Sequence, residues 1–132
     1  MTFARMFWLL GLTLAASLAA PPAEAQAQAG QNYYVVTVDF GTAPENFERF
    51  KQIMNENAKA SVSEETGCRE FNVYEIAATP NHLFLFEVYD DEAAFQRHVD
   101  SAHFKHSSAT WAPIITSNTG TRGTMFVSYH RP

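Results

Sequence analysis

Residues 83–105, LFLFEVYDDEAAFQRHVDSAHFK, contain the two secondary-structure elements that the sequence predicts most clearly. The first seven are aliphatic or aromatic apart from Glu87, a composition that fits a β-strand. Asp91 and Glu92 then supply a cap and an acidic first turn for a helix. The residues at helical spacing on one face of that helix are Ala94, Phe95, His98 and Val99. The stretch therefore predicts a strand that runs into an amphipathic helix with a histidine on its apolar face.

Apolar periodicity and turn residues place the remaining elements on either side of this stretch. Aromatic and β-branched residues make Tyr33–Phe40 a strand, and Pro44 suits the first turn of the helix that follows. The alternation in Cys68–Ile76 predicts a second strand, and 117–123 reads as a loop before the last strand. The expected elements are strands at 33–40, 68–76, 83–89 and 124–129, a helix over 44–63, a helix from Glu92, and a helical segment after Ser101.

This order, β-α-β-β-α-β, is that of a ferredoxin-like α+β domain with helices on one face of a four-stranded sheet. Both faces of the third strand are apolar. One face carries Leu83 and Leu85, and the other carries Phe84, Phe86 and Val88. A sheet covered by helices on one side needs a second layer on its other apolar face. A second copy of the sheet is the economical source of that layer, so we expect a homodimer.

The segment 1–25 has the build of a secretory signal peptide. Arg5 gives a positive start, an apolar run follows from Met6 to Ala20, and small residues precede a cleavage point after Ala25, or as late as residue 29. Residues 26–32 would then be a flexible leader to a domain at 33–132. A retained membrane anchor is the alternative, although the run is shorter than the about 20 residues of a membrane span. Export predicts a periplasmic or secreted protein, without stable membrane insertion once the signal is removed.

Charge and cysteine content disfavour a nucleic-acid partner and exclude an internal disulfide. Loss of the segment 1–25 removes Arg5 and Glu24, so 9 basic side chains become 8, 14 acidic ones become 13, and the net charge stays at −5. The basic residues form no cluster that could follow a phosphate backbone. Cys68 is the only cysteine, so it has no partner within the chain. The part of the chain after Ala25 is long enough for one domain with its own core.

Three histidines within nine positions, His98, His103 and His106, raise the question of a metal site. His103 and His106 are three apart and could share a helix face, whereas His98 and His103 would diverge on a continuous helix. The chain has no HExxH motif and no pair of cysteines. It also lacks a nucleophile-elbow serine and a phosphate-cradling glycine pattern. We therefore expect no metal, and conventional hydrolase or nucleotide chemistry is disfavoured.

Polar residues at positions that should face the interior are the other candidates for a site. His98 either is a satisfied core residue or faces a pocket, where its near-neutral pKa would make it a proton carrier. Glu87 interrupts an apolar strand, so its carboxylate needs a histidine, an arginine or a backbone donor as partner. Asn57 on the first helix is either a solvated amide or a pocket group. Phe71 and Trp111 are either core residues or the aromatic walls of a ligand pocket.

The chain resembles the antibiotic biosynthesis monooxygenase domain family, and its quinol monooxygenase branch looks most similar. The segments that carry the resemblance are 57–62 (NAKASV), 65–73 (ETGCREFNV), 86–95 (FEVYDDEAAF), His98 and 101–105 (SAHFK). The similarity extends from Tyr33 to Tyr129. Thr66 departs from the usual Glu-Pro-Gly turn, which affects a turn rather than the chemistry, and Ala102 stands where a proline commonly precedes the histidine.

The resemblance implies a dimeric α+β barrel with a pocket between sheet and helices. Some members oxidise quinols or phenols with molecular oxygen and without flavin, haem or metal, because the deprotonated substrate can itself reduce oxygen. It implies His98 as the catalytic base, with Glu87 or Asn57 orienting the base or the substrate. The implied substrate contacts are Phe71, Tyr89, His103 and Trp111. We therefore expect a cofactor-independent monooxygenase of a quinol, phenolic or similar small aromatic substrate.

Two alternatives stay open. A related branch isomerises a small phosphorylated signalling molecule, whose phosphate needs basic side chains, and this chain offers scattered ones such as Arg69 and Lys105. Haem-degrading relatives match less well, because they carry a tryptophan at the position of His98 and a histidine at that of Ser108. The other alternative is an exported protein that binds a hydrophobic small molecule without turnover, in which His98 and Glu87 are satisfied core residues.

Overall fold

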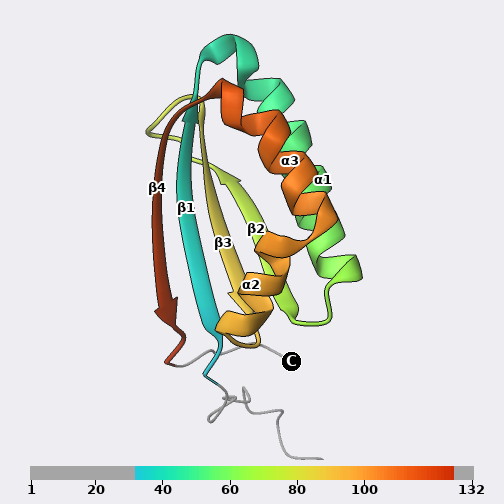
Figure 1. The fold of residues 1–132 in the computed structure, drawn as a ribbon. Coiled ribbons are helices and arrows are strands. Elements are labelled where there is room, and N and C mark those ends of the chain that lie inside the picture. Colours follow the sequence, from blue (N-terminus) through green and yellow to red (C-terminus); the bar gives the residue numbers. More distant parts are fainter. Residues whose placement is uncertain (1–31, 127–132) are drawn as a thin grey trace, which may run out of the picture.

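The computed structural model describes residues 32–126, which form a four-stranded antiparallel sheet with helices against one face (Figure 1). In chain order the elements are β1 (Tyr34–Thr42), η1 (Pro44–Asn46), α1 (Phe47–Glu64), β2 (Cys68–Glu75), β3 (His82–Tyr89), α2 (Glu92–Asp100), α3 (Ala102–Trp111), η2 (Ala112–Ile114) and β4 (Ile115–Thr124). The strands lie in the order β2-β3-β1-β4. This arrangement confirms the ferredoxin-like α+β fold.

β1 is paired on both sides and therefore fixes the register of the sheet. Val36 lies opposite Glu87 of β3 on one side and opposite Arg122 of β4 on the other. Because side chains alternate along a strand, this row of three residues shares the face that the helices cover. The same face of β3 carries Leu83 and Leu85, which are 1% and 3% exposed.

α1 packs against the sheet through a stripe of four buried side chains. They are Phe50, Met54, Asn57 and Ser61. Phe50 is fully buried and meets Phe40 of β1 edge-on, with the ring centroids 5.7 Å apart. Asn57 is buried rather than solvated, since its position on the helix lies within the apolar stripe.

The last strand lies earlier in the chain than the sequence predicts. β4 covers Ile115–Thr124, so the residues 117–123 are strand and not loop. Its serine, asparagine and glycine residues favour turns locally. The free edge of β1 overrides that preference by pairing with β4 from Tyr34 opposite Thr124 to Gly41 opposite Ser117. Residues 127–129, which the prediction also assigned to the strand, lie outside the described residues.

α2 and α3 are separated by one extended residue, Ser101, with φ −65° and ψ 153°. The Ser101 hydroxyl accepts a hydrogen bond from the backbone N–H of Phe104 at 3.1 Å and so caps α3, as Asp91 caps α2. The change of direction at this point brings the rings of His98 and His103 to 5.6 Å between centroids. On one continuous helix these two histidines would diverge, but the break at Ser101, where the sequence predicts a further helical segment, brings them together.

The face of the sheet away from the helices carries partly buried aromatic side chains. Phe84 and Phe86 of β3 have intermediate exposure, and Tyr74 of β2 is 50% exposed. The homodimer expected to cover this face stays a prediction.

The predicted signal peptide (1–25) and almost all of the leader (26–32) lie outside the described residues. Of the helices within residues 32–126, none combines the length and the apolar character that crossing a membrane requires. The predictions about export stay predictions.

Candidate functional site

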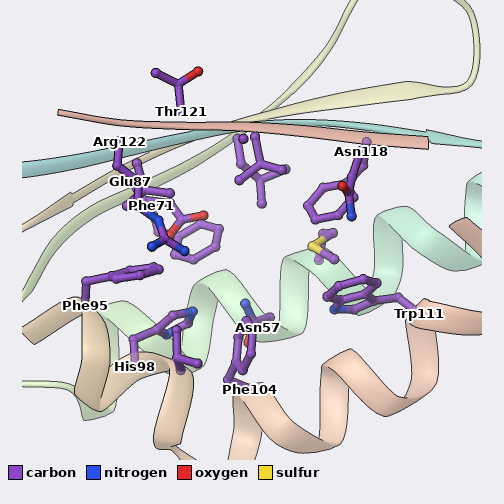
Figure 2. A pocket seen from close by; sticks show the side chains of 17 residues that line it. Asn57, Phe71, Glu87, Phe95, His98, Phe104, Trp111, Asn118, Thr121 and Arg122 are labelled. Atoms are coloured by element: carbon purple, nitrogen blue, oxygen red, sulfur yellow. The ribbon is translucent and has the colours of Figure 1, made fainter.

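A cavity of about 570 Å³ lies between the sheet and the helices (Figure 2). This volume is within the range of small-molecule sites. The aromatic residues in its wall are Phe40, Phe71, Phe95, Phe104 and Trp111. The side chains that bring polar groups to it include Asn57, Glu87, His98, Asn118 and Arg122. Such a lining can enclose a flat apolar molecule and meet it with a small set of hydrogen-bonding groups.

His98 reaches the cavity from α2 and is 2% exposed. Its Nδ1 lies 2.8 Å from Oε1 of Glu65 and 3.3 Å from Oγ of Ser61. The Ser61 hydroxyl donates its hydrogen to the carbonyl of Asn57 at 2.8 Å, so towards His98 it can only accept. A carboxylate also only accepts, and Nδ1 of His98 must therefore carry the proton.

The other ring nitrogen of His98 is then the basic one. Nε2 has no hydrogen-bond partner among the described residues, and in the neutral ring it holds a lone pair. Burial lowers the pKa of His98 below its ordinary value, although Glu65 opposes that shift. The histidine is thus held neutral, in one tautomer, with its basic nitrogen available to a ligand.

Glu65, the residue that follows α1, accepts hydrogen bonds from two histidines. Its Oε1 lies 2.8 Å from Nδ1 of His98 and 2.5 Å from Nε2 of His103, while its other oxygen is buried without a partner among the described residues. Sequence reasoning treated the segment at Glu65 as a turn without a chemical role. The signal available was a carboxylate just before the Thr66-Gly67 helix stop, but nothing local shows which histidines it meets.

His103 lies beside His98 but does not line the cavity. Its Nδ1 is 3.2 Å from Oδ1 of Asn57, and its Nε2 contacts Glu65. The residue expected to contact substrate therefore links Glu65 to Asn57 instead. Asn57 itself lines the cavity, and its side chain orients His103 rather than His98.

The group Glu65, His98 and His103 also has the residue types of a metal site, with its ligand atoms within 4.8 Å of one another. Two of the separations, 2.8 Å and 2.5 Å, are hydrogen-bond lengths. Ligand atoms on a tetrahedral zinc with bonds of about 2.0 Å lie about 3.3 Å apart. These side chains would have to separate to hold a metal, so the arrangement fits a hydrogen-bonded cluster better. The absence of a bound metal stays a prediction.

Glu87 lies on the cavity face of β3 and is 4% exposed. Its partner is the hydroxyl of Tyr89, which donates to Oε2 at 2.8 Å, and not the histidine, arginine or backbone donor expected. Burial raises the pKa of Glu87 to about 7, against the lowering effect of the Tyr89 hydrogen bond. Glu87 does not hydrogen-bond His98, since Glu65 occupies that place. Near neutral pH its carboxyl group can either donate or accept a proton.

Two of the aromatic residues expected around a substrate line the cavity, and one does not. The ring of Phe71 lies 5.9 Å from that of His98, and the ring of Trp111 lies 5.1 Å from that of Phe40. Tyr89 is fully buried beside His98 and is not part of the cavity wall. Burial raises the pKa of its hydroxyl, which therefore acts as a hydrogen-bond donor to Glu87.

Sequence reasoning missed the contribution of β4 to the cavity. Asn118, Gly120 and Arg122 line it from this strand. They alternate with period two, which would have placed them on one face had the segment been taken as a strand. The loop assignment removed that signal.

Comparison with known proteins agrees with this architecture. The family model described as antibiotic biosynthesis monooxygenase matches residues 33–110. A candidate antibiotic biosynthesis monooxygenase from Nitrosomonas europaea is 23% identical, with a TM-score of 0.69 over 73% of this chain and 92% of that one. Another from Bacteroides thetaiotaomicron is 24% identical, with a TM-score of 0.67 over 71% and 90%. Rv0793 from Mycobacterium tuberculosis is 22% identical, with a TM-score of 0.62 over 70% and 92%.

Comparison with curated proteins gives no match. The likenesses to these three solved structures, each below 25% identity, show a shared fold. The family model goes further, because it matches more than half of the 132 residues, from the start of β1 to the last turn of α3. The chain therefore belongs to the antibiotic biosynthesis monooxygenase family.

Proposed function

We propose that this protein is a monooxygenase that oxidises a quinol or similar phenolic substrate with molecular oxygen and needs no cofactor. The observation that carries the proposal is the state of His98 in the cavity. Its Nδ1 proton is held by Glu65, so a basic Nε2 is left without a partner among the described residues, in an enclosure of aromatic rings. A base fixed in one tautomer by a carboxylate is suited to remove a phenolic proton.

The first step follows from that geometry. Nε2 of His98 takes a proton from a quinol hydroxyl, and Glu65 stabilises the imidazolium that forms. The resulting anion is electron-rich at the neighbouring ring carbon. It transfers electrons to oxygen and bonds to it, and His98 returns its proton to give a hydroperoxide on that carbon.

Glu87 has the acidity required for the second step. With a pKa of about 7, its neutral form can protonate the departing hydroxyl of the hydroperoxide as water. The carboxylate then takes up the proton of the same ring carbon, which becomes a carbonyl. One oxygen atom stays in the hydroxyquinone product, the other leaves as water, and the quinol supplies all four electrons. No external reductant is required.

The isomerase alternative would use the same acid and base but requires a more polar cavity lining. A phosphorylated sugar-like substrate presents many polar groups, whereas five aromatic rings line this cavity. Arg122 is the only lysine or arginine among the described residues that line it. The lining therefore favours a flat aromatic substrate.

We further propose a homodimer whose interface covers the outer face of the sheet, and a periplasmic or secreted location after removal of the leader. The homodimer is supported by Phe84 and Phe86 on that face and the location by the sequence of residues 1–25. Mass measurement in solution at micromolar concentration tests the homodimer, and a monomeric mass would contradict it.

Oxygen uptake by purified protein with a panel of quinols tests the activity. The parent should consume oxygen without added cofactor, and His98→Ala should lose at least about a hundredfold of the rate. His106→Ala is the matched control, because His106 is an exposed histidine outside the cavity. Equal rates for His98→Ala and the parent would remove His98 as the base. Binding of quinols without oxygen uptake would instead favour the non-enzymatic binder.

A further inference from the structure

The cavity has a mouth formed by β4, the edge strand of the sheet. Asn118, Gly120 and Arg122 lie opposite Phe40, Val38 and Val36 of β1. Figure 2 shows the side chains of Asn118 and Arg122 on the cavity side of the strand, while Thr121 points away. Gly120 places no side chain between them, and a Cβ added there would meet only the carbonyl oxygen of Thr37, at 3.7 Å. On this face of β4, no side chain of the strand therefore lies between Asn118 and Arg122.

Arg122 is held at this mouth without a counter-charge among the described residues. Its guanidinium carbon lies 4.8 Å from the centroid of the Phe95 ring, a cation–π contact that fixes the group over an apolar surface. Within the part of the chain that the structure describes, no carboxylate lies within ion-pair distance of it. Glu87 shares its row across Val36 but is bonded to Tyr89. Arg122 therefore offers its positive charge to an anionic ligand that enters the cavity.

The distance from this cation to the base is limited by Phe95. The Phe95 ring centroid is 4.8 Å from the Arg122 guanidinium carbon and 6.4 Å from the His98 ring centroid. The sum of these two distances is therefore the upper limit on the separation between the Arg122 guanidinium carbon and the centre of the His98 ring. One aromatic ring with a hydrogen-bonding substituent on each side is long enough to reach both groups at any separation up to this limit. A substrate hydroxyl at His98 would therefore leave a substituent on the far side of the ring, meta or para to that hydroxyl, near Arg122.

We propose that Arg122 binds a carboxylate on the substrate, so that the natural substrates are phenols or quinols that carry a carboxylate on the ring. That the substrate is a phenol or quinol rests on the proposed function, whereas the anion site at Arg122 is argued from the geometry of β4 alone. A planar guanidinium matches a carboxylate with two parallel hydrogen bonds. A single positive charge also balances a carboxylate monoanion, while a phosphate dianion would keep an excess negative charge.

The test compares two ligands that differ only in this charge, 2,5-dihydroxybenzoate and its methyl ester. Affinities are measured by calorimetry without oxygen, so that no turnover is required. The parent should bind the acid at least about tenfold more tightly than the ester. Arg122→Gln should remove that preference by weakening the acid alone, and Arg122→Lys should keep part of it. Arg97→Gln is the matched control, because Arg97 is an exposed arginine of α2 outside the cavity.

Equal affinities of the parent for acid and ester would overturn the proposal, and so would a preference that survives in Arg122→Gln. Arg122→Gln should fold like the parent, because Arg122 is exposed on an edge strand. Circular dichroism that matches that of the parent checks this. Binding of phenyl phosphate more tightly than of the acid would also overturn the choice of a carboxylate. A parent that prefers the acid but consumes no oxygen would contradict the proposed function and leave the anion site standing.

Discussion

The two ends of the cavity differ in how their polar groups are held. At the inner end, His98 is 2% exposed, its Nδ1 is bonded to Glu65, and Glu87 is bonded to Tyr89. At the mouth, Arg122 lies on an exposed edge strand, where it contacts an aromatic ring and forms no ion pair with a carboxylate of residues 32–126. The inner groups are arranged in advance by the protein, so they suit proton transfer. The charge of the outer group is not paired with a carboxylate in the described part of the chain, so it suits recognition of an anionic substrate.

Phe95 links the two ends, and its removal should have the largest effect. The ring contacts Arg122 and packs near His98, and it is 9% exposed. Phe95→Ala should lower the free energy of unfolding by about 3–5 kcal/mol, because it leaves a cavity in the core. Urea denaturation measures the change, with Phe126→Ala as control at a 96% exposed position. A loss under about 1 kcal/mol would show that α2 does not anchor the cavity.

Glu65→Gln should impair proton transfer at the inner end of the cavity and leave the mouth unchanged. The amide keeps the size of the side chain but removes the charge that stabilises a His98 imidazolium and holds its Nδ1 proton. We expect the turnover number for quinol oxidation to fall about a hundredfold, with little change in KM. Glu64→Gln, one residue earlier and exposed, is the control. A fall in affinity for 2,5-dihydroxybenzoate equal to the fall in turnover would mean that Glu65 shapes binding rather than proton transfer.

Glu87→Gln should change how stability depends on pH. The folded pKa of Glu87, about 7, lies above its ordinary value of 4.5, so the folded state binds the proton more tightly than the unfolded state. The contribution of Glu87 is therefore full below pH 4.5 and is lost as the pH rises to 7. Relative to the parent, the variant should gain about 1–3 kcal/mol between these limits. Urea denaturation at pH 4.5 and pH 8 measures it, and a constant difference would show that Glu87 ionises normally.

The sequence predicts the inner end better than the mouth, for a physical reason. His98 and Glu87 break apolar patterns, so each is visible as a polar residue in a buried position without any knowledge of its partner. The partner is not visible, because Glu65 reaches His98 and His103 only through the break at Ser101, where one extended residue redirects the chain. Periodicity describes a face of one helix and cannot say how two helices meet.

For β4, the local sequence does not indicate the element itself. Its serine, asparagine and glycine residues carry little strand preference, and the segment forms a strand by pairing with the free edge of β1. Arg122 therefore reads as a loop residue, although the register of β1 places it in one row with Glu87. Long-range pairing, which no local pattern encodes, is what turns a surface arginine into part of a cavity.

Metal removal should have the smallest effect, namely none, and it tests whether the inner end is a hydrogen-bonded cluster. Oε1 of Glu65 is 2.8 Å and 2.5 Å from its two histidine nitrogens, which suits shared protons better than a metal between them. After dialysis against EDTA, with residual metal checked by mass spectrometry, oxygen uptake should match that of the untreated protein. Loss of activity that added zinc, iron or copper restores would contradict this reading. It would also remove the base, because Nδ1 of His98 would then bind the metal instead of donating its proton to Glu65.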